Sequence, residues 1–294
     1  MIWILYAFGA AAIWACINIL DKFVVTRWVR NHLVPFLFTA IANAVTLAVI
    51  WLWFDIERLP AAVAAAAALS GALYIIGAML YFRALQLEEV SRVVPLFYLG
   101  PLFTAVLAWI FVGEVFGFAT YVGVALLIAG SVLVSVRKFE WFRPTPAFWM
   151  MVGASFLLSA GGVSLKYALD AGGFWSVFLY GRVGELAVTI PLAVYVFKDF
   201  IAAVREHGKR VAGIMLLTEA LDIAAVVLYT LAAATGFVTL VAAFVSLNAF
   251  FAFVLVLVLS IWFPRILHEE YSAKIILQKL IAIALMFAGV LLVL

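Results

Sequence analysis

The sequence predicts an all-α polytopic membrane protein with ten transmembrane helices, arranged as two inverted five-helix repeats. Composition is the first observation behind this prediction, because 69% of the 294 residues are hydrophobic and only 11% are charged. Soluble domains average roughly 45–50% apolar and about 25% charged residues. A soluble fold of this length has too little interior to bury so much apolar surface. The other two observations are the number of long apolar runs and a similarity between the two halves of the chain.

Ten apolar runs are long enough to cross a bilayer, since a transmembrane helix needs about 20 mainly apolar residues. They cover residues 2–24, 34–54, 61–85, 92–112, 118–136, 147–169, 173–197, 211–234, 238–262 and 275–294. The runs lack the alternation of apolar and polar residues that marks β-barrel strands. Short polar connections separate them, such as "DKFVVTRWVRNH" and "KDFIAAVREHGKR". The first run has no basic segment before it, which favours a transmembrane helix over a cleaved signal peptide.

The two five-helix halves, residues 1–138 and 147–294, show a weak similarity that keeps its order along the chain. A shift of 148 positions aligns Tyr81 with Tyr229, and apolar positions around them align as well. Because five is an odd number, the second half crosses the membrane in the opposite sense to the first. Inverted repeats are typical of alternating-access transporters, in which the substrate site lies between the halves near the bilayer midplane.

One stretch of the first half carries a recognisable pattern, "YFRALQLEEVSRVVPLFYLGPLFTAVLAWIFVGEVFGFATYVGVALLIAGSVLV" (81–134). Its features are, in order, Ala84-Leu85, a polar turn, Pro101 after an apolar run, the pair Gly113-Glu114, and a glycine-spaced helix ending at Gly130. On these features the chain resembles the EamA domain of the drug/metabolite transporter superfamily. The resemblance implies a secondary carrier of small metabolites, commonly amino acids or related compounds, that works without ATP. The chain also has no phosphate-binding Gly-Lys-Ser/Thr loop. In the second half the pattern is degenerate.

The seventh run contains Arg182 and Glu185 near its middle, within "YGRVGELAVTIPLAVYVF". A charge inside a bilayer costs roughly 2.5–3.5 kcal/mol on insertion scales, so charges that persist there usually face a cavity or a partner. The spacing of three residues places both side chains on one helix face. Two interpretations follow: the residues neutralise each other, or Arg182 faces a central cavity and binds an anionic group while Glu185 tunes it.

The eighth run contains two acids near its middle, Glu219 and Asp222 of "TEALDIAA". Two carboxylates on one helix face do not readily ionise together when no cation lies between them. One of them is therefore predicted to carry a proton during transport. In the alternative interpretation, Arg182 neutralises both acids across the interface between the seventh and eighth helices. We expect these two acids to form one charged patch with Arg182 and Glu185 that lines a cavity.

Four further residues are predicted to bind substrate: Asn18 and Asn248 within spans, and Tyr81 and Tyr229 at corresponding positions of the two halves. The alternatives are hydrogen bonding between helices for the asparagines and packing for the tyrosines. Glu114 follows a glycine in a short turn and is predicted to lie in the first turn of the next helix. The fourth run contains two prolines, which interrupt a helix and free backbone carbonyls, as suits a hinge or a cavity wall.

Other classes of function fit the sequence less well. The net charge of +3 is scattered, so the sequence predicts no nucleic-acid partner. A membrane-embedded enzyme needs a nucleophile with a base or a metal cluster, but His32, His207 and His268 lie far apart in connections, and Cys16 has no evident partner. No metal or cofactor is expected; the expected partners are a small-molecule substrate, the lipid bilayer and protons. A channel or a membrane assembly factor remains the alternative from another class.

Among carriers, the alternative substrates are nucleotide-linked or lipid-linked sugars, whose phosphate Arg182 and Lys166 would hold. Orientation is also open. The odd-numbered connections contain 15 of the 18 Lys and Arg residues, while the even-numbered connections and the termini contain two. Basic residues stay on the cytoplasmic side of short connections. The charge bias therefore predicts a cytoplasmic-membrane protein with both termini outside, whereas the family resemblance implies both termini inside.

Overall fold

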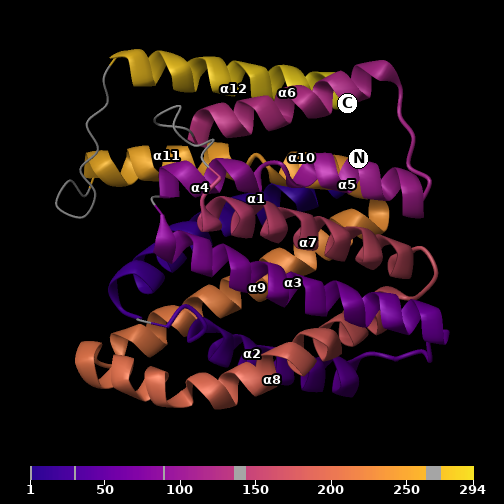
Figure 1. The fold of residues 1–294 in the computed structure, drawn as a ribbon. Coiled ribbons are helices and arrows are strands. Elements are labelled where there is room, and N and C mark those ends of the chain that lie inside the picture. Colours follow the sequence, from indigo (N-terminus) through magenta and orange to yellow (C-terminus); the bar gives the residue numbers. More distant parts are fainter. Residues whose placement is uncertain (1, 30, 89, 136–143, 263–272) are drawn as a thin grey trace.

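The computed structural model describes residues 2–29, 31–88, 90–135, 144–262 and 273–294, and every regular element within these ranges is a helix (Figure 1). The helices are α1 (Ile2–Arg27), α2 (Pro35–Trp53), α3 (Ala61–Leu87), α4 (Val90–Phe97), α5 (Gly100–Phe111), α6 (Phe118–Ser135), α7 (Pro146–Leu169), α8 (Phe174–His207), α9 (Arg210–Thr235), α10 (Val238–Val245), α11 (Asn248–Trp262) and α12 (Ala273–Val293). In the described ranges, nine stretches are long and apolar enough to span a membrane, and Leu277–Val293 is a shorter apolar helix. The predicted all-α polytopic membrane protein is confirmed.

The fourth predicted run is two helices, α4 and α5, separated by a turn at residues 98 and 99. Proline explains this break, because Pro101 has no N–H to donate to the carbonyl of Phe97 four residues earlier. The hydroxyl of Ser155 on α7 donates to that carbonyl instead, at 3.1 Å, and to the carbonyl of Leu96 at 3.0 Å. The predicted interruption is thus present, and a neighbouring helix satisfies the freed backbone groups.

The ninth predicted run is also two helices, α10 and α11, with a turn at residues 246 and 247. The sequence contains no proline here, and this break was not predicted. Ser131 of α6 supports the turn, because its hydroxyl donates to the backbone carbonyl of Ser246 at 3.0 Å. The two broken runs occupy the fourth position of their respective halves.

The seventh predicted span was too short, because α8 runs for 34 residues to His207. At about 1.5 Å per residue it is much longer than the roughly 30 Å hydrocarbon core. The polar connection expected after residue 197 is therefore largely helical. Tertiary packing supports this extension, since Phe200 contacts the ring of Phe38 at a centroid distance of 5.3 Å.

The helices pack in pairs that join the two halves of the chain (Figure 1). Helix α3 packs along α7, α1 along α9, α2 along α8, and α6 along α12. If each helix is replaced by the helix at the same position in the other half, the α3–α7 pair becomes the α9–α1 pair. The α2–α8 and α6–α12 pairs are unchanged. A two-fold exchange of the halves preserves these four pairs, but it does not reproduce the packing of α3 on α8 to the same extent between α9 and α2. The division into repeats at residues 1–138 and 147–294 stays a prediction.

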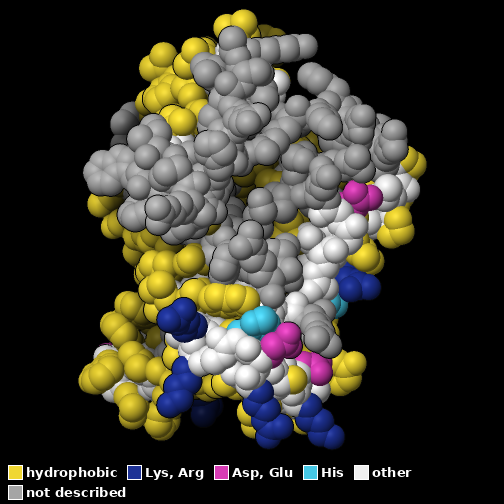
Figure 2. Space-filling model, turned by 90° about the vertical axis from the view of Figure 1, so that its left-hand side faces the viewer, with side chains coloured by type: hydrophobic (Ala, Val, Ile, Leu, Met, Phe, Trp, Pro, Cys, Tyr) yellow, Lys and Arg dark blue, Asp and Glu magenta, His cyan; other side chains and the backbone are white. Residues whose placement is uncertain are grey.

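The two ends of the helix bundle differ in charge. One end, which we call the basic end, carries exposed cations from α3, α8, α9 and the turn between α8 and α9: Arg83, Lys198, Arg205, Lys209 and Arg210. Figure 2 shows this face, with Lys and Arg side chains gathered along its lower edge. Both chain termini lie at the opposite end, which we call the termini end (Figure 1).

Candidate functional site

A cavity of about 290 Å³ lies among the helices of both halves. Residues of α1 to α5 and of α7 to α11 line it. All eight residues predicted from the sequence as site residues belong to this lining: Asn18, Tyr81, Arg182, Glu185, Glu219, Asp222, Tyr229 and Asn248. The polar residues predicted from separate helices are thus brought together around one space.

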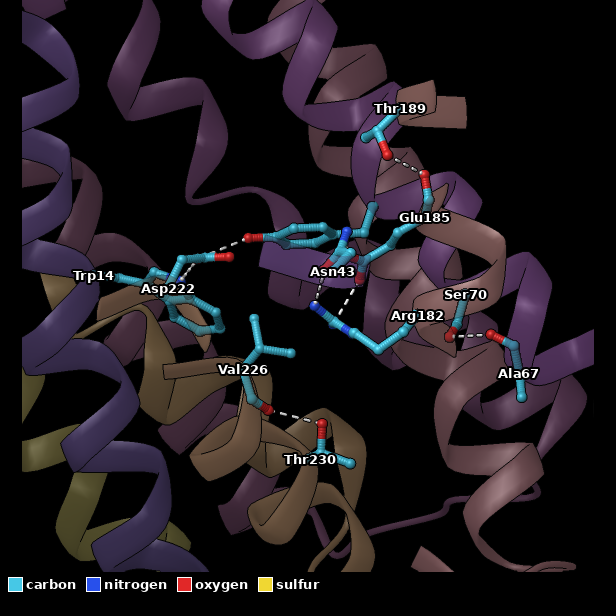
Figure 3. A network of polar contacts seen from close by, with 11 residues as sticks. Trp14, Asn43, Ala67, Ser70, Arg182, Glu185, Thr189, Asp222, Val226 and Thr230 are labelled. Atoms are coloured by element: carbon cyan, nitrogen blue, oxygen red, sulfur yellow. Dashed lines mark hydrogen bonds and ion pairs between the residues drawn. The ribbon is translucent and has the colours of Figure 1, made fainter. Parts of the chain in front are cut away.

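Arg182 and Glu185 form a closed polar cluster with Asn43 of α2 (Figure 3). Arg182 Nη2 lies 2.5 Å from Glu185 Oε1. Asn43 accepts a hydrogen bond from Arg182 Nη1 at 3.0 Å and donates one to Glu185 Oε2 at 2.8 Å. The guanidinium group also lies over the ring of Phe178, 4.9 Å from its centroid. Because Arg182 and Glu185 are only 5% and 2% exposed, these contacts compensate charges that have little access to solvent.

One donor of Arg182 has no partner. Its Nε is buried and makes no hydrogen bond with any described group. An unsatisfied buried donor costs roughly 1–3 kcal/mol, so such a group in a folded protein calls for an explanation. Arg182 lines the cavity, but this N–H is itself buried, so an acceptor group of a bound molecule would reach it only if the side chain moved.

Close packing of α8 on α3 holds this cluster against the cavity. A Cβ atom on Gly184 would lie 1.8 Å from the carbonyl oxygen of Ala68, a distance that no side chain allows. Glycine at this position therefore lets the two backbones approach. The approach fixes the rotation of α8 and, with it, the direction of Arg182 and Glu185.

The two acids of α9 lie across the cavity and have neutral partners. Trp14 Nε1 of α1 and the hydroxyl of Tyr74 of α3 both donate to Asp222 Oδ1, at 2.9 and 3.0 Å. Thr39 of α2 donates to Glu219 Oε1 at 2.7 Å. Arg182 forms its ion pair with Glu185, and no ion pair joins it to either acid of α9 among the described residues.

Sequence reasoning missed a third acid, Asp21. It was assigned to the first polar connection, but α1 continues to Arg27, and Asp21 lines the cavity. No hydrogen bond or ion pair joins its side chain to the described residues. A helical signal was present, because Asp21 lies three residues after Asn18 and seven after Trp14, which places all three on one helix face.

The predicted asparagines meet at the two helix breaks. Asn18 Nδ2 donates to Asn248 Oδ1 at 3.0 Å, and the hydroxyl of Tyr98 lies 3.4 Å from the same oxygen. Asn248 begins α11, and Tyr98 lies in the turn after α4. Both predicted tyrosines pack against other rings: Tyr81 on Phe97, and Tyr229 on Trp14. The two asparagines and the two tyrosines therefore line the cavity and also make hydrogen bonds or ring contacts within the protein.

Lys166 and Glu114 lie elsewhere, at the termini end. Lys166 forms an ion pair with Asp170 at 2.8 Å and lines a second, separate pocket. The structure therefore does not bring Lys166 to Arg182 as a phosphate-binding pair. The prediction that Glu114 lies in the first turn of the next helix is wrong, because α6 begins only at Phe118. Its carboxylate binds the backbone of α10 instead.

The described ranges contain no cluster of three or more His, Cys, Asp or Glu residues suited to a metal ion. Of the three histidines, His268 lies outside the described residues. The arrangement offers hydrogen-bond donors, acceptors and one fixed cation around a small space. These are the elements of a binding site for a small polar molecule.

Comparisons with known proteins bear on the family and the fold of the chain. Residues 1–136 match the EamA-like transporter family, which confirms the resemblance predicted from residues 81–134. Over 72 residues the chain is 35% identical to an uncharacterized protein of Methanocaldococcus jannaschii. This match covers 24% of the chain and 53% of that protein, so the chain spans about half the length of this relative. A protein of known crystal structure shares the fold, with a TM-score of 0.66, 19% identity, and 98% and 95% of the two chains covered.

Proposed function

We propose that the protein is a secondary active transporter of small metabolites, such as amino acids or related compounds, in the cytoplasmic membrane. The observation that carries this proposal is the cavity between the halves, which is lined by Arg182 on one side and by three carboxylates, Asp21, Glu219 and Asp222, on the other. Its volume of about 290 Å³ is near the lower end of the roughly 300–1,000 Å³ of small-molecule sites. The EamA-like match of residues 1–136 supports a transporter.

In this proposal Arg182 binds an acceptor group of the substrate, such as a carboxylate. Glu185 and Asn43 each bind one of its terminal nitrogens and hold the guanidinium in place, which leaves Nε without a partner. A charge-assisted hydrogen bond from a preoriented donor is stronger than one between neutral groups. Substrate binding then satisfies a donor that is otherwise buried without a partner.

Glu219 and Asp222 are the proposed proton carriers. They lie one helical turn apart on α9, and their hydrogen-bond donors are neutral side chains. Neither acid forms an ion pair with a described residue, and uptake or release of a proton by either acid changes the charge of the cavity. Alternating access would use the two broken runs, whose short half-helices supply movable segments near the midplane.

A screen and an exchange assay test the carrier proposal. Purified protein is first heated with a panel of metabolites, because a ligand of the folded state raises the melting temperature. The metabolite with the largest shift is then loaded into proteoliposomes containing the protein. A carrier accelerates uptake of the labelled metabolite when unlabelled metabolite is present on the other side. Uptake without such acceleration, and without saturation, would indicate a channel and contradict the proposal.

For orientation we propose the arrangement with both termini outside, which the basic end supports. Single cysteines in a variant lacking Cys16 test this, one placed within residues 204–210 and one after Leu294. An impermeant thiol reagent applied to intact cells should label only the C-terminal site. Labelling of the 204–210 site with protection of the C-terminal site would reverse the assignment.

A further inference from the structure

Glu114 of the first half binds the start of a helix that belongs to the second half. Its side chain lies in the turn between α5 and α6 and is only 5% exposed. One carboxylate oxygen accepts from the backbone N–H of Val238 at 2.7 Å, and the other accepts from that of Thr239 at 3.0 Å. Both bonds are made to the first two residues of α10.

Helix α10 needs these bonds because its own sequence cannot supply them. The first N–H groups of any helix lack partners within the helix, and a serine, threonine, aspartate or asparagine at the N-cap usually satisfies some of them. Phe237 stands at the N-cap of α10 and has no side-chain acceptor. A carboxylate from another segment meets both needs, since it accepts two hydrogen bonds and places negative charge at the positive end of the helix dipole.

The turn that carries Glu114 is shaped to present it. Gly113 has a φ of 70°, in the left-handed region that glycine adopts without strain at helix ends. A Cβ at this position would meet no atom within 4 Å. Glycine is therefore favoured here by the backbone conformation and not by a lack of space. The N–H of Glu114 turns back to the carbonyl of Ala108 at 3.2 Å, and the ring of Phe116 packs on that of Phe237 at 5.2 Å.

The far end of α10 reaches the cavity. Val245 is its last residue and, with Ser246 and Asn248 after it, lines the cavity at the break of the ninth run. This short helix therefore connects the Glu114 contact at the termini end with the cavity. A movement of either end is transmitted to the other, because a helix of two turns moves as a rigid unit.

We propose that Glu114 is a positioning residue of the transport cycle, a latch that joins the two halves at the termini end. While its carboxylate caps α10, the cavity stays closed toward that end; release of the cap lets α10 move and opens it. This inference rests on the proposed transporter function. What it states about the molecule itself is that the Glu114 carboxylate controls access to the cavity from the termini end.

Thiol labelling at two positions tests the latch in the full-length protein without Cys16, reconstituted in liposomes. The first reporter is Thr239→Cys, beside the latch, where the threonine is 1% exposed and its hydroxyl has no partner. The second is Thr218→Cys, which lines the cavity on α9 nearer the basic end. Each reporter is combined with Glu114→Gln, which keeps the shape of the side chain but loses its charge and one acceptor. Asp170→Asn is the control, since it neutralises a carboxylate that lines the same pocket as Glu114 but is paired with Lys166.

With Glu114→Gln we expect labelling of the Thr239→Cys reporter to become about tenfold to a hundredfold faster, as for loss of a hydrogen bond to a charged group. Labelling of the Thr218→Cys reporter should stay constant or slow down, and Asp170→Asn should change neither rate. Glu114→Asp, which retains the charge, should restore much of the slow labelling. The assay needs no substrate, so it is separate from a failure to find transport.

Three results would overturn the latch. The first is an unchanged rate at the Thr239→Cys reporter in Glu114→Gln. The second is an equal acceleration at both reporters, which indicates general loosening of the fold. The third is an equal effect of Asp170→Asn, which indicates that any lost charge at this end suffices.

Discussion

The two sides of the cavity differ in whether their charged residues form an ion pair. On the α8 side, Arg182 is paired with Glu185, and Asn43 bridges them. On the α1 and α9 side, the acids Glu219 and Asp222 are hydrogen-bonded only by neutral donors, and Asp21 has no described partner. We propose that the paired residues stay charged during transport and that the acids without an ion pair bind and release a proton. In this proposal the first side anchors the substrate and the second couples transport to protons.

The largest effect is expected from breaking the pair on the α8 side. Arg182→Gln leaves Glu185 as a buried carboxylate without its cation, and we expect a loss of about 3–5 kcal/mol of unfolding free energy. The double variant Arg182→Gln/Glu185→Gln should recover much of that loss, because no lone charge remains. Denaturant unfolding in detergent micelles measures both. Equal destabilisation in the single and double variants would show that the two residues do not compensate each other.

A much smaller effect on stability is expected on the other side. Asp222→Asn keeps an acceptor for Trp14 and Tyr74, and Glu219→Gln keeps one for Thr39, while each removes a costly buried charge. We expect a change within about 1 kcal/mol in either direction, the range of a single neutral hydrogen bond. The same unfolding assay applies. A loss as large as that of Arg182→Gln would mean that these acids are also part of a compensated network and would remove the contrast between the sides.

The smallest effect is expected from Asp21→Asn. Removing this charge weakens the attraction of the remaining two acids for a proton. Transport should then reach half of its maximum at a lower pH, because a nearby negative charge disfavours ionisation of a carboxylate. The pH profile of uptake into proteoliposomes gives the shift, with the exposed Asp55→Asn as control. A shift to higher pH, or an equal shift in the control, would separate Asp21 from the coupling acids.

The sequence predicted features that depend on local pattern. Ten apolar runs became helices or pairs of helices, and Pro101 marked the break of the fourth run. The charged residues within spans were informative because burial of Arg182 or Asp222 in lipid is costly unless they face a cavity. Such residues indicate where a polar interior must exist.

Features that depend on distant partners were not predictable from one sequence. Asn43 lies 139 residues from Arg182, and Glu114 lies 124 residues from Val238, so no spacing rule connects them. The break at Ser246 carries no proline and is supported by Ser131 of another helix. Asp21 was misassigned because a charge near the end of an apolar run looks like the start of a connection, and only the packing of α1 on α9 shows that the helix continues.

The most direct test of the central claim is a measurement of proton movement with substrate. Proteoliposomes contain a trapped pH indicator, and the stabilising metabolite from the thermal screen is added outside. We predict that the metabolite changes the internal pH in vesicles with the unmodified protein, and that Glu219→Gln/Asp222→Asn abolishes this change while the metabolite still stabilises the protein. A metabolite-driven pH change of full size in the double variant would contradict the assignment of coupling to the α9 acids.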